Sequence, residues 1–182
     1  MNGRRVIALL GGTFDPVHDS HVRLARRALS DLPVDVVRLV PNGAPPHRSS
    51  PLYDWAERVR RCTVALGGVP RIEVGMEESP DTPRYTIHTI RRHRARRRSV
   101  ILVMGADAFA GFHHWRRWDD ILRRVNIAVA RRGGESRPHA AVRARIRDAK
   151  NPRMLARGAG KVWQWRFRPG DDSATMIRSR NK

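Results

Sequence analysis

The sequence predicts an α/β protein built on an open, doubly wound parallel sheet. Short and fully apolar runs, such as residues 6–10 and 100–104, are typical of strands that are buried on both faces. Stretches with apolar residues at helical spacing separate these runs, and strand, helix and strand in succession form a right-handed crossover between parallel strands. The chain has 182 residues, the usual size of one domain, so we expect a single domain over residues 1–182.

The first half of the chain alternates in this way from its start. Residues 6–10 end in two glycines, and we expect this run to be the first and central strand. Residues 20–32 carry apolar side chains at helical spacing and lead into a second strand at 34–40. Next come a proline-rich loop at 41–51, a helix with the apolar stripe Trp55, Val59, Cys62 and Leu66 behind the capping pair Asp54 and Glu57, and a short strand at 71–74.

The second half continues the alternation and then becomes less regular. We expect a helix at 86–97, an apolar strand at 100–104, a helix at 118–124 and a strand at 126–130. Residues 131–160 are polar and arginine-rich, and one weak helix is expected near 140–149. Residues 162–167 alternate like an exposed strand. Ligands of such sheets bind beyond the carboxyl ends of the strands.

Composition excludes several classes of protein. The single cysteine, Cys62, provides neither an intrachain disulfide nor a cysteine-rich zinc site, so nothing requires an oxidising compartment. The apolar runs are far shorter than the roughly 20 residues that span a bilayer, and no signal peptide is visible, so we expect a cytoplasmic protein with no membrane partner. The formal net charge of +20 attracts polyanions without naming one.

The residues after the first strand carry the strongest pattern, Gly-Gly-Thr-Phe-Asp-Pro-Val-His-Asp-Ser-His at 11–21. Glycines allow the backbone to turn sharply and to approach a ligand. The helix that follows directs free backbone N–H groups and its positive end at a phosphate. His18 and His21 are three residues apart, so both lie on one side of the first helical turn and can hold the same group.

These eleven residues resemble the signature of the nucleotidyltransferases that join a nucleotide or cofactor precursor to AMP, Gly-Gly-Thr-Phe-Asp-Pro-x-His-x-Gly-His. Only one specified position differs, because Ser20 stands where the family has glycine. The resemblance implies a Rossmann-like sheet of the nucleotidyltransferase type. It also implies that a side chain at Ser20 either crowds the ATP phosphates, which we favour, or adds a hydrogen bond.

Five further segments follow the order seen in bacterial nicotinate-nucleotide adenylyltransferase. They favour this subclass over pantetheine-phosphate adenylyltransferase, which lacks the proline-rich and tryptophan-rich segments. Two departures are Asp172, where the family has isoleucine, and His88, where many relatives have aspartate. The segments are Pro-Pro-His-Arg at 45–48, Tyr-Thr-Ile at 85–87, Gly-Ala-Asp at 105–107, Phe-x-x-Trp-x-x-Trp at 112–118 and Ser-Ala-Thr-Met-Ile-Arg at 173–178.

The resemblance implies transfer of AMP from ATP to nicotinate mononucleotide in NAD biosynthesis, giving nicotinate adenine dinucleotide and pyrophosphate. His18, His21 and Arg178 are the expected catalytic residues. Mg²⁺ is expected to arrive with ATP, because no cluster of carboxylates is visible; the metal ligands and the oligomeric state stay open. The expected ATP-binding residues are Gly11, Gly12, Thr13, Phe14, His18, His21, Gly105, Asp107, Ser173, Thr175 and Arg178, and those for nicotinate mononucleotide are Asp15, Pro46, His47, Arg48, Tyr85, Thr86 and Trp115.

Three alternatives remain at this stage. A related adenylyltransferase would act on nicotinamide mononucleotide or phosphopantetheine. A pseudoenzyme of low activity would fit Ser20, Asp172 and a chain that stops four residues after Arg178. A nucleic-acid-binding protein would use the six arginines within 91–98, although the run lacks interleaved aromatic residues and a charge run is usually a solvated helix face, so we expect only nonspecific binding.

Overall fold

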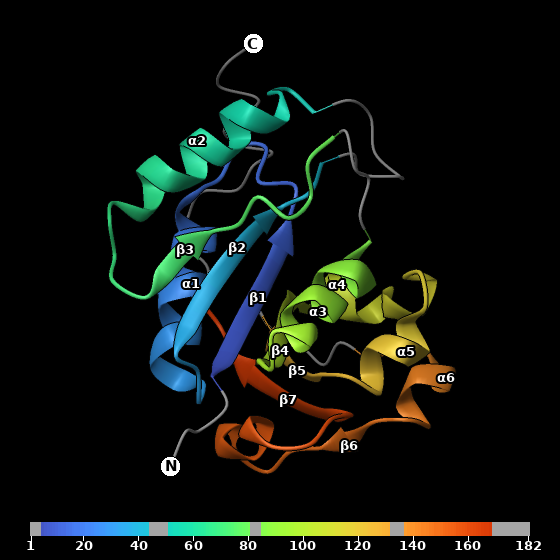
Figure 1. Cartoon of the computed structure of the whole chain (residues 1–182). Coiled ribbons are helices and arrows are strands. Elements are labelled where there is room, and N and C mark those ends of the chain that lie inside the picture. The colour runs from blue at the N-terminus through green and yellow to red at the C-terminus, as the bar shows by residue number, and fades with distance from the viewer. Residues whose placement is uncertain (1–4, 44–50, 81–84, 132–136, 169–182) are drawn as a thin grey trace.

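Seven parallel strands form one sheet in the order β3-β2-β1-β4-β5-β7-β6 (Figure 1). The computed structural model of the chain describes residues 5–43, 51–80, 85–131 and 137–168. This sheet confirms the predicted α/β class. The strands are β1 (Val6–Gly12), β2 (Val36–Pro41), β3 (Ile72–Val74), β4 (Ser99–Gly105), β5 (Asn126–Arg131), β6 (Arg147–Asp148) and β7 (Lys161–Arg166).

Helices cover both faces of the sheet. One face packs against the first two α-helices and the second 3₁₀-helix, and the other face packs against the remaining helices. Within the described ranges, no helix is both long enough and apolar enough to cross a bilayer. The helices are α1 (Asp19–Asp31), α2 (Trp55–Leu66), α3 (Thr86–Ala95), α4 (Ala106–Ala110), η1 (Phe112–His114), α5 (Trp118–Leu122), α6 (Ala140–Arg143) and η2 (Pro152–Ala156).

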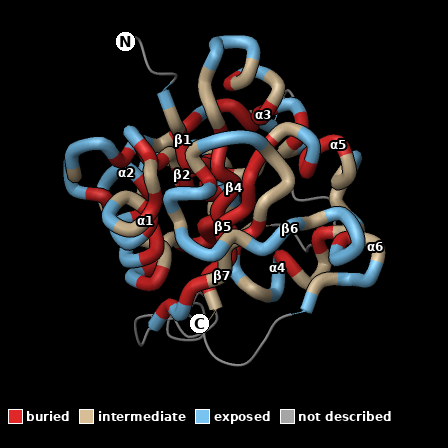
Figure 2. The backbone as a smooth tube through the Cα atoms, turned by 90° about the horizontal axis from the view of Figure 1, so that it is seen from below, coloured by how far each residue is buried: buried red, intermediate tan, exposed pale blue. Residues whose placement is uncertain are grey.

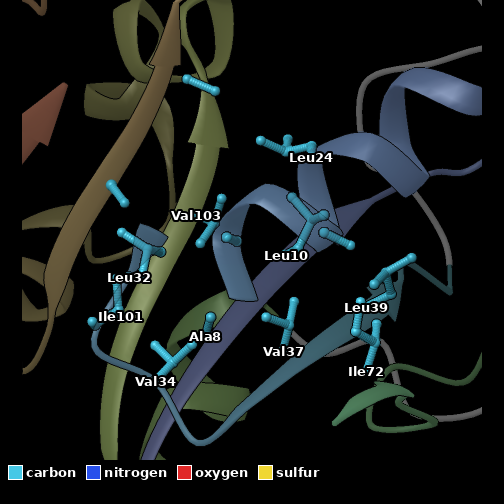
Figure 3. Close-up of a cluster of buried hydrophobic side chains, with 14 of the residues drawn as sticks. Ala8, Leu10, Leu24, Leu32, Val34, Val37, Leu39, Ile72, Ile101 and Val103 are labelled. Atoms are coloured by element: carbon cyan, nitrogen blue, oxygen red, sulfur yellow. The ribbon is translucent and has the colours of Figure 1, made fainter. Parts of the chain in front are cut away.

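Alternate residues of each central strand enter the two cores. In β1, Ala8 and Leu10 face α1 and pack with Val37 and Val103 of the neighbouring strands (Figure 3). Ile7 and Leu9 belong to the core on the opposite face. The run is apolar because both faces of these strands are covered, as the sequence predicted. Figure 2 shows the central strands β2, β4 and β5 as largely buried and the edge strand β6 as exposed.

The order of the strands fixes where a ligand can bind. The chain runs from β1 outward to β2 and β3, and then returns to place β4 on the other side of β1. The strand order thus reverses between β1 and β4, and in doubly wound sheets ligands occupy the crevice beyond the carboxyl ends of strands at such a point. Those ends are Gly12 and Gly105.

Two predictions for the last third of the described chain were wrong. The helix expected at 140–149 ends at Arg143, because the backbone then pairs with β7: the N–H of Ala149 donates to the carbonyl of Val162 at 2.7 Å. The strand expected to be exposed is instead interior, between β5 and β6. Trp165 is 5% exposed and packs in the core over α1.

The remaining differences concern short elements and ends. The sequence pattern did not predict α4, η1 or η2, which are too short to show a helical period. The expected helices at 86–97 and 118–124 end two residues early, at Ala95 and Leu122. Most of the expected loop at 41–51 lies outside the described residues, whereas Pro41 pairs as the last residue of β2.

Candidate active site

The loop after β1 is tightly packed rather than open. Phe14 is 2% exposed and its backbone lies in the left-handed region at a φ of 50°, which side chains other than glycine adopt rarely. Its ring lies against Gly12, where an added Cβ would come within 3.0 Å of the ring. A side chain at position 12 would therefore press against the Phe14 ring, so the ring favours glycine there independently of any approach of a ligand.

The structure brings His18 and His21 together at the start of α1. His18 is the residue that precedes the helix, in extended conformation, and it is 9% exposed. Its backbone N–H donates to Nδ1 of His21 at 3.3 Å, and the two ring centroids are 3.8 Å apart. The Phe14 ring meets His21 edge-on at 4.9 Å. The predicted catalytic pair is thus preorganised at the amino end of a 13-residue helix.

The hydrogen bond from His18 also indicates the tautomer of a neutral His21 ring. Nδ1 of His21 accepts this bond, so in the neutral ring the proton lies on Nε2. Nε2–H is consequently the atom with which His21 can donate to an anionic ligand. Ser20, in the same helical turn, is 4% exposed, so its side chain occupies space at this packed helix start.

Asp15 joins the loop to a segment far along the chain. Its carboxylate accepts hydrogen bonds from the backbone N–H groups of Leu52 and Tyr53, at 2.8 and 3.0 Å. The residue is 4% exposed. In this structure both carboxylate oxygens of Asp15 bind the segment that precedes α2. A contact from Asp15 to nicotinate mononucleotide stays a prediction.

Arg58, in the first turn of α2, was not among the predicted site residues. It is 1% exposed, and its guanidinium donates to three backbone carbonyls: Nη1 to Thr13 at 2.6 Å, Nε to Tyr53 at 3.2 Å and Nη2 to Gly43 at 3.3 Å. Burial lowers the pKa of Arg58 from its usual value, and the charge of Asp15 opposes this shift. A sequence signal existed, because Arg58 precedes Cys62 by four residues and therefore lies on the buried face of the helix.

Other predicted residues lie at the same edge of the sheet. Gly105 ends β4, and Asp107 is exposed in the first turn of α4. Thr86 begins α3, and Tyr85 before it is 39% exposed, with the Arg116 guanidinium 4.7 Å from its ring centroid. Both helices begin at the carboxyl edge, since α3 follows β3 and α4 follows β4.

The aromatic segment after α4 is mainly packing. Trp115 is half-buried, and its ring centroid lies 5.4 Å from that of Phe112, which is fully buried. Trp118 packs against the same phenylalanine at 6.5 Å. A role of Trp115 in nicotinate binding stays a prediction. The predicted residues Pro46, His47, Arg48, Ser173, Thr175 and Arg178 lie outside the described residues.

Two buried carboxyl groups after β3 were also missed by sequence reasoning. Burial acts to raise the pKa of Glu77, but the hydrogen bond from His93 and the charge of Arg38 lower it to about 2. Burial raises the pKa of Glu78 to about 7, and Glu77 adds to this shift while a hydrogen bond from the Thr89 hydroxyl at 3.1 Å opposes it. These groups join the end of β3 to α3, the helix that begins with Thr86.

The described side chains form no group suited to a resident metal ion. Across residues 5–43, 51–80, 85–131 and 137–168, no three or more histidine, cysteine, aspartate or glutamate side chains are grouped so that they could hold a metal ion.

Comparison with known proteins shows the family of the chain. Residues 9–180 match the family model described as cytidylyltransferase-like. The chain belongs to this family. It is 38% identical over 187 residues to a probable nicotinate-nucleotide adenylyltransferase of Pseudomonas paraeruginosa, covering 97% of this chain and 86% of the relative. A protein of the same name from Pseudomonas fluorescens is 38% identical, with 97% and 85% covered.

A solved structure has the same fold. The nicotinic acid mononucleotide adenylyltransferase of Plasmodium falciparum, complexed with NaAD, superposes with a TM-score of 0.71 over 97% of this chain and 83% of its own. Its sequence identity of 14% means that this likeness concerns the fold. The bacterial relatives confirm the resemblance to nicotinate-nucleotide adenylyltransferase that the motifs predicted.

Proposed function

We propose that this protein transfers AMP from ATP to nicotinate mononucleotide, giving nicotinate adenine dinucleotide and pyrophosphate in NAD biosynthesis. The observation that carries the proposal is the His18–His21 pair, held at the amino end of α1 where the strand order reverses. The names of the bacterial relatives support the same reaction. We assign it to the cytoplasm.

The reaction needs positioning and charge neutralisation more than a protein nucleophile. A phosphate oxygen of nicotinate mononucleotide attacks the α-phosphorus of ATP in line, the bond from this phosphorus to the bridging oxygen breaks, and pyrophosphate leaves with the electron pair. His21 donates from Nε2, and His18 with the amino end of α1 faces the same phosphates. Arg178 completes the proposed catalytic set on the leaving pyrophosphate.

Mg²⁺ enters the proposal as part of the ATP substrate. A divalent cation bound to the triphosphate neutralises charge that builds on the departing pyrophosphate. The absence of a grouped metal-ligand set among the described side chains fits a cation that is bound by phosphate and water. We therefore assign the chain's own donors to the phosphate oxygens that the cation leaves free.

The proposed division of substrates follows the two sides of the reversal point. ATP lies over Gly11, Gly12, Thr13 and Phe14 and reaches Gly105 and Asp107, with Ser173 and Thr175 beside its phosphates. Nicotinate mononucleotide lies toward α3, where exposed Tyr85 precedes the helix, Thr86 begins it and Trp115 offers an aromatic face. Asp15, Pro46, His47 and Arg48 are the further residues proposed to bind nicotinate mononucleotide.

The decisive experiment measures pyrophosphate release by the purified protein with ATP and Mg²⁺. Nicotinate mononucleotide, nicotinamide mononucleotide and phosphopantetheine are supplied separately at equal concentrations. We expect the highest kcat/KM with nicotinate mononucleotide. Faster turnover of another acceptor would reassign the enzyme to the related activity, and no turnover with any acceptor would identify a pseudoenzyme.

A further inference from the structure

Arg58 links three chain segments at the edge of the candidate site. Thr13 belongs to the loop after β1, Gly43 follows β2 and Tyr53 precedes α2, and the backbone carbonyls of all three accept hydrogen bonds from this one buried guanidinium. Planar guanidinium carries five N–H groups in a fixed fork, so a single side chain can hold carbonyls that arrive from different directions. A lysine ammonium at the end of a flexible stem does not reproduce this geometry.

The loop that Arg58 holds contains a disfavoured backbone conformation. Phe14 has a φ of 50°, and such a left-handed residue persists only where its surroundings fix it. Both of its neighbours are fixed: the carbonyl of Thr13 accepts from Arg58, and the carboxylate of Asp15 accepts from Leu52 and Tyr53. Arg58 and Asp15 therefore hold the two sides of the Phe14 turn.

The Phe14 turn in turn sets the position of the histidines. The Phe14 ring contacts His21 edge-on, and only three residues separate Phe14 from His18. If the turn relaxed toward an ordinary conformation, the Phe14 ring would leave its place against Gly12 and His21. The amino end of α1 and the Nε2–H group of His21 would then shift relative to a bound phosphate.

We propose that Arg58 is a positioning residue for the phosphate-binding loop, acting by holding the Thr13 carbonyl so that His18 and His21 are preorganised for the triphosphate. It touches no reacting atom, because its N–H groups are directed at backbone carbonyls and its side chain is 1% exposed. The inference rests on the proposed adenylyl transfer and deepens it by naming a residue that prepares the ATP site.

The test compares Arg58→Lys and Arg58→Gln with two controls on the same helix. Arg60→Gln removes an exposed arginine whose partner is Glu57. Leu66→Ala removes a buried side chain, 3% exposed, from the core two turns farther along α2. Melting temperature, kcat and the KM for ATP are measured for each protein, and ATP affinity is measured separately by calorimetry.

For Arg58→Lys we expect kcat to fall at least tenfold and the KM for ATP to rise at least threefold at a temperature where the variant is folded. Leu66→Ala should lose as much melting temperature or more and keep kcat and KM within twofold of the parent, and Arg60→Gln should match the parent in all respects. Parental kinetics in Arg58→Lys, or an equal kinetic loss in Leu66→Ala, would overturn the proposal.

Asp15→Asn keeps the inference testable if neither Arg58 variant folds. This change weakens the bonds from Leu52 and Tyr53 that hold the other side of the Phe14 turn, and it leaves the Arg58 side chain in place. We therefore expect the same loss of kcat and rise in the KM for ATP. Unchanged kinetics count against the proposal. Failure of the proposed function gives a different result. A parent that binds ATP and releases no pyrophosphate refutes the function, whereas parental ATP affinity in Arg58→Lys refutes the positioning role.

Discussion

The loop after β1 lies at the carboxyl edge of the sheet, and the arginine-rich end of α3 lies at the amino edge. The two regions differ in burial, because the polar groups of the loop are buried and several arginines at the end of α3 are exposed. In the loop region Asp15, His18 and Arg58 are 4%, 9% and 1% exposed, and backbone hydrogen bonds fix them. At the end of α3, Arg92, Arg96 and Arg97 are exposed where the chain turns into β4 at Ser99, the amino edge of the sheet.

A basic sequence can thus contain two kinds of positively charged group, exposed ones and buried, hydrogen-bonded ones. Exposed arginines attract any polyanion and are screened by salt, whereas a group held by buried hydrogen bonds keeps one geometry. Even within the arginine run, the partly buried Arg91 is bonded, because it pairs with Asp120 at 2.8 Å. The candidate site is therefore recognised by buried, bonded polar groups rather than by the density of charge.

The largest expected effect comes from the histidines of the loop. His18→Ala or His21→Ala should lower kcat by roughly two to three orders of magnitude, the loss typical of removing one transition-state donor. Pyrophosphate release at saturating ATP and nicotinate mononucleotide measures it. His139→Ala, which removes an exposed histidine before α6, is the matched control and should stay within twofold. Near-parental kcat in either loop variant would make the pair purely structural.

The buried carboxyl group of Glu78 is expected to make the stability of the protein depend on pH. Its pKa of about 7 lies above the usual 4.5, so the folded protein holds a proton that the unfolded chain releases, and the free energy of unfolding falls as pH rises between these values. The loss approaches about 3 kcal/mol above pH 7, at about 1.4 kcal/mol for each pKa unit.

Urea unfolding at pH 5 and pH 8 measures this dependence in the parent and in Glu78→Gln. The glutamine carbonyl still accepts from Thr89 but does not titrate, so the difference between the two pH values should shrink by most of that amount. An unchanged difference would mean that another group carries the pH dependence.

Ser20→Gly should have a moderate effect. Ser20 is buried in the first turn of α1, and removing its side chain gives the ATP phosphates more room, so we expect kcat/KM for ATP to rise severalfold. A glycine inside a helix costs about 0.5–1 kcal/mol, so the melting temperature should fall slightly. Steady-state kinetics and a melting curve measure both quantities. A fall in kcat together with melting temperature would show that the Ser20 hydroxyl contributes to the site.

The smallest expected effect on catalysis comes from the exposed arginines. Changing Arg92, Arg96 and Arg97 together to glutamine should leave kcat and both KM values within twofold. Binding of single-stranded RNA at low salt should weaken, and its dependence on log salt concentration should become shallower by about 2, as expected for three lost phosphate contacts. RNA binding by the parent that survives moderate salt would contradict the assignment of this surface to nonspecific attraction.

Patterns within single segments determined much of this protein. The apolar run at 6–10 predicted the first strand and the stripe through Cys62 and Leu66 predicted a helix, and both predictions are confirmed. The sharp turn expected at Gly11 and Gly12 was wrong, because both pair with β2 as the last residues of β1 and the left-handed residue is Phe14. Asp54 caps α2 as expected, accepting from the N–H of Glu57 at 2.7 Å. Such features can be predicted from the sequence because they involve residues that are near one another in the chain. This holds for the periods of strands and helices and for the capping of helices.

Only the tertiary structure decided how the site is held and how the end of the sheet is built. Arg58 donates to a carbonyl 45 residues away, and Asp15 accepts from N–H groups 37 and 38 residues away, so no local pattern reports these bonds. β7 looks like an exposed strand in its alternation, yet pairing with β5 and β6 places it inside the sheet. The physical reason is the same in each case: burial and hydrogen bonding depend on which distant segment arrives alongside, and that is settled when the whole sheet packs.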